Sequence, residues 1–512
     1  MGTCVIQRDP VAAASQRYDA IVVGGGIHGV AMTLEAARRG MRVLLLEKGD
    51  FGGATSFNTL RILHGGFRYL QSMDLRRFRV SVAERRWFMQ HFSDLVRPLP
   101  CLMPLYGQGV RRPGILRTAL IVNDILGAHR NDGVVESLYL PPGQLLDFEE
   151  TTYLYPEVDR SGLCGSALWY DAIMLSSERI IMEMLRWACR CGANVLNYVA
   201  VDRPLLSGNR IVGVEARDAI TQHSFTFEAP LIINCAGPWC GQMAATFWHP
   251  RPDLFQPSLA FNLLLDRPSI SSCALALTPQ RPHARTYFLV PWRGRILVGT
   301  FHTAYTDEPV HPRPTISQIE AFLHDINAAA PHLNVTVADV VQVFAGLLPT
   351  DAIGDVEPSS RTRIIDHAAL GGPEGFVSVS GVKFTTARHV AEQTLRTWFA
   401  ARRMPLPPYR NATQPDAASR RDWITLFDAD ELSVSPETIR RIAEEESVVH
   451  VDDLLLRRGH WNGTHDEGMQ CGQHILDILN WTGEHGRAEL ERLDRELQCL
   501  HGSLVKEVET TR

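Results

Sequence analysis

The chain has 512 residues, 45% of them hydrophobic, so it is too long for one ordinary domain and two or three domains with sizeable cores are predicted. Its formal net charge of -6 gives no reason to expect a nucleic acid partner, and no stretch reaches the roughly 18 apolar residues of a membrane-spanning helix. The 10 cysteines form no C-x-x-C pair, which favours reduced thiols in a cytoplasmic compartment over a zinc site, and no metal is expected.

A strand, a glycine-rich turn, a helix and a second strand are predicted between residue 20 and Glu47. The turn residues expected to contact a cofactor are Gly24, Gly26, Ile27, His28 and Gly29. Their G-x-G-x-x-G spacing permits a tight turn, close approach of a pyrophosphate and close helix packing, and the helix N-terminus favours phosphate charge. Glu47, which precedes Lys48, stands where a carboxylate can accept hydrogen bonds from ribose hydroxyls. The segment therefore predicts a bound dinucleotide without a 2′-phosphate.

The next segment combines small hydroxylated residues, paired glycines and polar side chains. These residues are Ala54, Thr55 and Ser56, followed by His64, Gly65, Gly66, Arg68 and Tyr69. They resemble the flavin-contacting segment of FAD-dependent glycerol-3-phosphate dehydrogenases, in which Ala-Thr-Ser leads to His-Gly-Gly-Leu-Arg-Tyr-Leu. The resemblance implies non-covalent FAD beside residues 54–56 and the two glycines. It also implies that His64, Arg68 and Tyr69 face a substrate.

Two helices are predicted after this segment. Residues 74–92 alternate basic with apolar side chains at helical spacing, which is typical of a surface helix. Residues 111–126 are basic at the start and apolar afterwards. The resemblance places this second stretch near a membrane-facing quinone entrance, and a basic amphipathic segment suits peripheral contact with the inner face of a membrane. The alternative is a helix packed on the core with two solvated arginines.

Later motifs are expected to return to the cofactor. Asp171 matches the first acid of a family motif, whereas residues 174–178 replace its acid pair and arginine. Strands are predicted at 195–199, 211–216 and 223–229. A buried strand at 230–239 ends in Ala-Gly-Pro-Trp, and a strand, turn and helix start at 375–386 resemble the family's Gly-Gly-Lys-x-Thr-Thr closure. The FAD contacts that these two motifs imply are Ala236, Gly237, Trp239, Gly381, Lys383, Phe384 and Thr385.

Three positions depart from the family pattern near the expected substrate. Residues 287–300 resemble the family's Pro-Trp hairpin, but His302 stands in the place of the aspartate of a Thr-Asp pair. The phosphate-contacting arginine of Gly-x-Arg-Pro is Leu348, and a substrate-facing histidine is Asn262. Loss of one arginine from a phosphate site costs roughly 2–5 kcal/mol. A changed substrate is therefore predicted.

The resemblance covers nearly the whole chain and implies an α/β fold. It predicts a Rossmann-like FAD-binding domain, an inserted β-rich substrate domain and a C-terminal helical domain. Within residues 18–400, the FAD-binding part is expected at approximately 18–100, 150–240 and 340–400, and the substrate part at 101–149 and 241–339. Residues 1–17 lack the apolar core of a signal peptide and are expected to be a flexible tail. Residues 401–420 are expected to be a linker, and residues 421–512 the helical domain.

The motifs predict hydride transfer from a C–OH group of a small polar or anionic substrate to flavin N5. His64, Lys383 and Arg68 are the expected catalytic groups. His64 is the candidate proton acceptor, with Lys383 or His302 as substitutes. Each also has a simpler role: His64 can bond to backbone, Lys383 can neutralise reduced flavin, and His302 can lie on the surface.

Two other functions stay open. An oxidase of C–N bonds in the same broad fold would make imines and need no proton acceptor for oxygen. A protein that has lost catalysis would bind a flavin that no substrate reduces. The electron acceptor is expected to be a quinone or oxygen. The sequence does not distinguish between the two, since neither has a short binding motif. A homodimer is also compatible with the resemblance.

Overall fold

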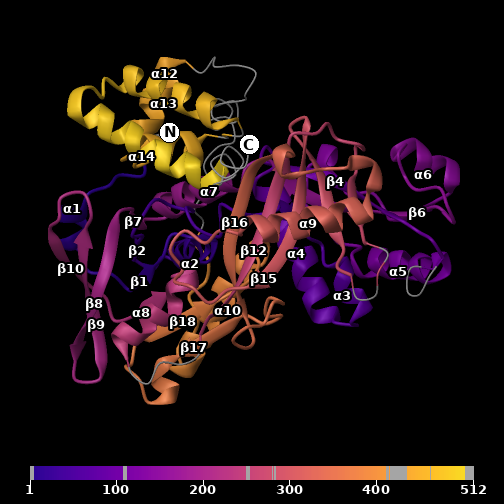
Figure 1. The fold of residues 1–512 in the computed structure, drawn as a ribbon. Coiled ribbons are helices and arrows are strands. Elements are labelled where there is room, and N and C mark those ends of the chain that lie inside the picture. Colours follow the sequence, from indigo (N-terminus) through magenta and orange to yellow (C-terminus); the bar gives the residue numbers. More distant parts are fainter. Residues whose placement is uncertain are drawn as a thin grey trace.

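Three β-sheets organise the chain in this computed structural model (Figure 1). The structure describes residues 5–107, 112–248, 254–279, 281, 284–410, 414, 435–459, 461 and 463–501. The expected α/β fold is confirmed, with a Rossmann-like sheet, a β-rich part and a C-terminal helical part.

The six-stranded sheet contains the predicted β-α-β unit. Its order is β17-β18-β11-β1-β2-β7, and every neighbouring pair is parallel except the pair at the β17 edge. The strands are β1 (Ala20–Val23), β2 (Val43–Leu46), β7 (Asn194–Leu196), β11 (Ile232–Asn234), β17 (Arg363–Asp366) and β18 (Phe376–Ser380). Helix α2 (Ile27–Arg38) packs against α7 (Ser177–Arg190) and α10 (Ala387–Ala401). The glycine turn between β1 and α2 therefore lies at the carboxyl edge of the sheet, where open α/β folds bind ligands.

The nine-stranded sheet has the order β16-β12-β15-β14-β13-β4-β6-β3, with β5 also paired to β6. Its strands are β3 (Ile62–Leu63), β4 (Val96–Pro104), β5 (Gln144–Leu146), β6 (Ser166–Met174), β12 (Gln256–Leu265), β13 (Ala274–Leu277), β14 (Tyr287–Trp292), β15 (Arg295–Ala304) and β16 (Val340–Thr350). Helix α9 (Ile316–Ala329) packs on this sheet, where the ring of Phe322 lies 5.7 Å from Phe261 and 5.1 Å from Tyr287.

Smaller elements surround these two sheets. The three-stranded sheet at the left of Figure 1 contains β8 (Val199–Ser207), β9 (Arg210–Asp218) and β10 (Ser224–Glu228). The remaining helices before residue 400 are α1 (Pro10–Ala14), α3 (Phe67–Gln71), α4 (Leu75–His91), α5 (Pro113–Leu126), η2 (Glu136–Leu138), α6 (Phe148–Leu154), η3 (Gly237–Trp239), α8 (Cys240–Phe247), η4 (Pro331–Leu333), η5 (Val337–Asp339) and η6 (His367–Leu370). Arg111, which the sequence placed at the start of α5, lies outside the described residues.

The prediction of a flexible tail at residues 1–17 is wrong for the described residues 5–17. Ile6 is fully buried, and its N–H donates to Glu445 O at 2.7 Å. The Arg8 guanidinium pairs with Asp218, and Asp9 caps α1. A segment without a long apolar run can still dock on the protein through single side chains.

The C-terminal region is helical, as predicted, and lies at the top left of Figure 1. Its helices are α12 (Pro436–Glu445), the π-helix η8 (Asp453–Arg458), α13 (His465–Leu479) and α14 (Gly483–His501). Ser435 caps α12 and Pro436 is its first residue, which is the arrangement expected from the sequence. Of the expected linker at 401–420, residues 411–413 and 415–420 lie outside the described part.

Sheet pairing divides the chain differently from the predicted domain ranges. Strands β6 and β16 fall in the ranges expected for FAD binding, yet both pair within the nine-stranded sheet. The domain boundaries themselves stay a prediction. In the described part of the chain, no helix combines the length and the apolar character needed to cross a bilayer.

Candidate functional site

A cavity of about 2500 Å³ lies where the carboxyl ends of β1, β2 and β18 meet one face of β12, β15 and β16. The end of α14 contributes to its wall. All the site residues expected from the sequence line it except Gly29 and Gly65, which lie directly behind the lining. The sequence-predicted residues in the wall are Gly24, Gly26, Ile27, His28, Glu47, Lys48, Ala54, Thr55, Ser56, His64, Gly66, Arg68, Tyr69, Ala236, Gly237, Trp239, Asn262, His302, Leu348, Gly381, Lys383, Phe384 and Thr385.

The glycine turn is shaped to hold a phosphate group. Gly24 has φ +106°, and a Cβ on Gly29 would lie 1.8 Å from Gly24 O, so neither position accepts a side chain. Gly26 precedes α2 without a capping side chain, and Ile27 N–H donates to Ser56 Oγ at 2.9 Å. The N-terminus of α2 therefore faces the cavity with backbone donors and a positive dipole end.

Glu47 at the end of β2 is partly engaged by the chain itself. Gly25 N–H donates to Glu47 Oε2 at 2.6 Å, and Gly49 N–H donates to Oε1 at 2.8 Å. Burial raises the pKa of Glu47, and these two backbone hydrogen bonds oppose the rise. Beside it, the Lys48 ammonium lies 3.4 Å from the ring centroid of Trp239, so a cation–π contact joins the end of β2 to the Ala-Gly-Pro-Trp turn.

His28 is a half-buried side chain whose buried Nε2 has no protein partner among the described residues. Its ring lies against Gly381, where a Cβ would come within 2.2 Å of Nε2. Burial lowers the pKa of His28 to about 4, so the ring is neutral at pH 7. A buried polar atom that lines a cavity and lacks a partner is suited to a hydrogen bond with a bound ligand.

His64 is held from behind by Asp171 on β6. His64 Nδ1 lies 3.4 Å from Asp171 Oδ2, while Gly65 N–H and the Arg85 guanidinium donate to Oδ1 at 2.6 and 2.7 Å. Burial raises the pKa of Asp171, but the His64 hydrogen bond and the Arg85 charge outweigh it and hold that pKa below its usual range. With a carboxylate on Nδ1, the second ring nitrogen, Nε2, is left for the cavity.

Lys383 and Tyr69 form a second polar pair in the wall. The Lys383 ammonium donates to Tyr69 OH and lies 4.3 Å from the Tyr69 ring centroid. Arg68 on α3 is exposed in the cavity, and its guanidinium has no ion pair or hydrogen bond among the described residues. Two cations and a phenol thus converge between α3 and the loop that precedes α10.

Asn262 does not take over the proton-handling position of a histidine. Its Nδ2 donates to Asn58 O at 3.1 Å, and its Oδ1 accepts from Thr300 Oγ1 at 2.8 Å. The side chain is 2% exposed, so the amide is committed to joining β12 to β15 and to residue 58. Asn262, His302 and Leu348 nevertheless project from the same face of the nine-stranded sheet, as their strand register requires.

Several functional candidates were missed in the sequence. Arg85 lies on α4, which was expected at the surface, yet it is 5% exposed and bonded to Asp171. Arg285, Arg361 and Arg457 also line the cavity. All four arginines are brought to these positions by tertiary packing alone.

Comparisons with known proteins agree with this geometry. A family model described as FAD dependent oxidoreductase (DAO) matches residues 19–395. The glycerol-3-phosphate dehydrogenase of Synechocystis sp. is 30% identical over 78% of this chain and 73% of its own length. Glycerol-3-phosphate dehydrogenase 1 of Mycobacterium tuberculosis is 32% identical, over 78% of this chain and 76% of its own. The glycerol-3-phosphate dehydrogenase of Bacillus halodurans, solved with FAD, has the same fold, with a TM-score of 0.70 at 19% identity over 96% of this chain and 97% of that one.

Proposed function

Because this chain belongs to the DAO family of FAD-dependent oxidoreductases, with glycerol-3-phosphate dehydrogenases as its relatives, we propose that it oxidises a C–OH group of a small anionic substrate. The observation that carries the proposal is the His64–Asp171 pair, which faces the same cavity as the cations Arg68 and Lys383. An alcohol oxidation needs a group that takes the hydroxyl proton, and an anionic substrate needs cations.

FAD is the cofactor of this family, and the residues present fit it. The turn from Gly24 to Gly29 would hold the pyrophosphate, and Glu47 would accept from ribose hydroxyls with its remaining lone pairs. The neutral imidazole of His28, whose Nε2 has no partner in the described part of the chain, would hydrogen-bond the bound cofactor beside Gly381. The other FAD contacts we propose are Ala54, Thr55, Ser56, Gly65, Gly66, Ala236, Gly237, Trp239, Phe384 and Thr385.

FAD supplies the hydride acceptor when it is bound. The chain must then position the substrate carbon and remove the hydroxyl proton. His64 takes this proton at Nε2, because Asp171 occupies Nδ1 and stabilises the imidazolium that results. The positive charge of Arg85 and the Gly65 N–H fix the Asp171 carboxylate, so the imidazole is held in one orientation.

Lys383 and Tyr69 act on the substrate oxygen rather than on its proton. The Tyr69 hydroxyl accepts from the Lys383 ammonium, which leaves the phenolic proton free to donate to the oxygen as negative charge develops there. Arg68, which has no partner among the described residues, is available to an anionic group of the substrate.

The experiment is anaerobic mixing of the purified flavoprotein with glycerol 3-phosphate, with bleaching of the flavin band near about 450 nm as the readout. Rapid bleaching supports the proposal and shows that other cations compensate for Leu348. The same assay is then run on a panel of hydroxy acids, polyols, phosphates and amines. If the amines alone bleach the flavin, the proposal is wrong and the protein is an oxidase of C–N bonds. A flavin that dithionite reduces but no substrate of the panel reduces contradicts catalysis altogether.

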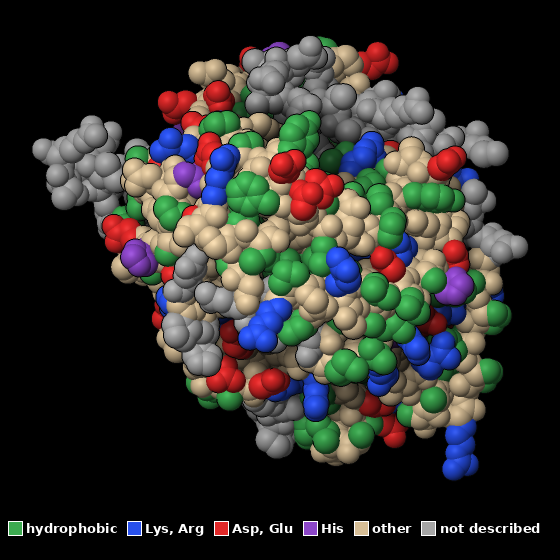
Figure 2. All heavy atoms as spheres, turned by 90° about the vertical axis from the view of Figure 1, so that its right-hand side faces the viewer, with side chains coloured by type: hydrophobic (Ala, Val, Ile, Leu, Met, Phe, Trp, Pro, Cys, Tyr) green, Lys and Arg blue, Asp and Glu red, His purple; other side chains and the backbone are tan. Residues whose placement is uncertain are grey.

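We further propose that quinone or oxygen reoxidises the flavin, and that the surface of α5 and α6 meets an anionic membrane. Apolar side chains on this surface are unusually exposed: Ile115, Ile121, Ile125, Val135, Tyr139, Phe148 and Tyr153. Figure 2 shows apolar side chains interspersed with basic and acidic groups on the face that carries these helices. Arg112 and Arg117 are exposed on the same helix, so apolar insertion and attraction to anionic lipid would act together.

A further inference from the structure

Two departures from the family pattern lie on one face of the nine-stranded sheet. Leu348 on β16 is opposite Ser258 on β12, and His302 on β15 is opposite Ala260 on the same strand. Residues 258 and 260 are two apart, so all four side chains point to the same side of the sheet, which lines the cavity. The wall therefore lacks an arginine at position 348, and it also lacks an acid at position 302.

Arg285 is close enough to His302 for its charge to act on that imidazole, and it precedes the start of β14 at Tyr287 by two residues. Its side chain lines the cavity and is 28% exposed. The only ion pair that Arg285 makes among the described residues is with Glu357, which is 71% exposed on a loop. An ion pair this accessible to water is weak, so the Arg285 guanidinium can bind another anion.

His302 is neutral and contributes no negative charge beside these arginines. Burial, together with the charges of Arg285 and Arg68, lowers its pKa to about 3, so both guanidinium groups act on this imidazole. His302 Nδ1 is buried without a hydrogen-bond partner in the described part of the chain. An aspartate at position 302 would instead attract the Arg285 guanidinium.

We propose that Arg285 and Arg68, together with neutral His302, form the anion-binding subsite of this protein and that Arg285 takes the role left open at Leu348. The inference rests on the proposed function, since it names the substrate group held at the same site. Arg285 precedes β14 and Leu348 lies on β16, and β15 and β12 stand between these two strands. The anionic group of the substrate is therefore held on the β14 side, and Leu348 offers an apolar wall on the β16 side.

The subsite suits an oxyanion, either a phosphate ester or a carboxylate, because a guanidinium binds both with two parallel hydrogen bonds. Calorimetric titration of the FAD-loaded protein with inorganic phosphate and with acetate measures this binding without any turnover. Saturable binding is expected for at least one of them. Tighter binding of phosphate assigns the subsite to phosphate esters, and tighter binding of acetate assigns it to carboxylates.

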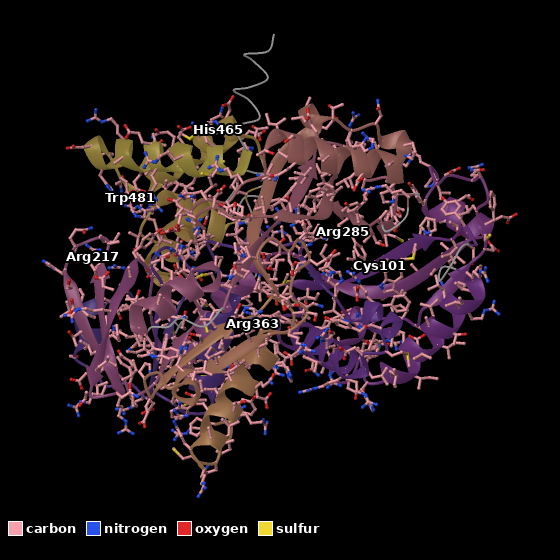
Figure 3. All side chains as sticks on the ribbon, turned by 60° about the horizontal axis from the view of Figure 1, so that its bottom comes forward. Cys101, Arg217, Arg285, Arg363, His465 and Trp481 are labelled. Carbon is pink, nitrogen blue, oxygen red and sulfur yellow. The ribbon has the colours of Figure 1, made fainter. Side chains whose placement is uncertain are left out.

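Two substitutions test the subsite independently. Arg285→Gln should weaken binding of the preferred anion by about 10- to 100-fold. His302→Asp should weaken it similarly while Arg285 is retained, because the new carboxylate competes for that guanidinium. The control is Arg217→Gln on β9, which lies at the far edge of Figure 3 whereas Arg285 lies near the middle, and it should leave the affinity within about twofold.

The outcomes separate this inference from the proposed function. Unchanged anion affinity in both Arg285→Gln and His302→Asp, with flavin content as in the original protein, overturns the subsite even if glycerol 3-phosphate bleaches the flavin. Lack of saturable anion binding in the original protein also overturns it. Anion binding that Arg285→Gln abolishes, in a protein whose flavin is reduced only by amines, supports the subsite and contradicts alcohol oxidation.

Discussion

At the scale of single residues, catalysis should depend on His64 through its Nε2. We expect His64→Ala to slow flavin reduction by about 10²- to 10⁴-fold, because general-base catalysis is lost while the cations that bind the substrate remain. Rapid mixing under anaerobic conditions measures this rate directly. Added imidazole should restore part of the rate in His64→Ala, because a free base can enter the space that the side chain leaves.

A structural role for His64 would give a different pattern. Flavin content and the apparent affinity for substrate should then change, and imidazole should have no effect. If His64→Ala keeps a rate within about threefold of the original while Lys383→Met loses it, the proton passes to Lys383 and the assignment of His64 is refuted. His302 is a poor candidate for the same role, since burial lowers its pKa to about 3.

The residues that the sequence predicted best are those in contiguous motifs. The turn from Gly24 to Gly29 and residues 381–385 all come to the cavity or directly behind it, because local chain geometry largely sets their positions. Arg85 and Arg285 were missed for a physical reason. Each is a basic residue in a segment whose sequence is typical of a solvated surface, and only tertiary packing turns it inward.

At the scale of elements, the exposed side of α5 leads to a prediction about membrane binding. Leu116 and Leu120 bury one side of this helix, while Ile121 and Ile125 are 53% and 69% exposed on the other. The double substitution Ile121→Glu with Ile125→Glu should reduce binding to vesicles of mixed anionic and zwitterionic lipid by about tenfold or more. The reason is that two apolar side chains that would move from water into the lipid are lost. Flotation of the protein with the vesicles measures the bound fraction.

A matched control tests whether vesicle binding is also weakened when exposed apolar side chains elsewhere on the surface are replaced. Leu206→Glu with Ile353→Glu replaces two side chains that are 49% and 78% exposed on other parts of the surface. This pair should leave vesicle binding unchanged. Equal losses in both double variants, or no binding by the original protein, would count against a membrane-facing α5.

The elements also show how far the sequence determines the fold. Strand β1 was predicted at its observed residues, and α12 starts at the predicted proline, because periodicity and capping are local signals. The pairing of β6 and β16 within the nine-stranded sheet was not predictable from local patterns. Long-range register decides which sheet a buried strand joins, and an apolar run fits either sheet equally well.

At the scale of the whole molecule, buried charges join the C-terminal helices to the cofactor-binding sheet. Arg458 on η8 donates two hydrogen bonds to Asp50, at 2.6 and 2.9 Å, and Arg457 adds a third at 3.1 Å. Asp50 lies three residues after Glu47, and Arg457 lines the cavity. A second pair, Arg179 on α7 with Glu446, crosses the same boundary at 2.9 Å. The C-terminal region therefore holds the loop after β2 in place.

Removing the Asp50 charge should loosen this junction and the cofactor together. Asp50→Asn leaves two buried arginines undercompensated, so the free energy of unfolding should fall by about 3–5 kcal/mol at pH 7. The dissociation constant for FAD should rise, because the same loop leads from Glu47. Denaturant unfolding and flavin release measure the two effects, and Asp202→Asn, which removes an exposed partner of Arg217, should change stability by less than about 1 kcal/mol.

The pH dependence of this effect has a definite sign. Burial raises the pKa of Asp50, but Arg458 and Arg457 outweigh it and hold that pKa below its usual range. Asp50 therefore contributes stability above the unfolded-state pKa of about 3.9, and the contribution is lost as the pH falls through the lower folded-state value. The stability difference between the original protein and Asp50→Asn should be full at pH 7 and shrink below about pH 4. A difference that stays constant into that range would assign the loss to packing rather than to charge.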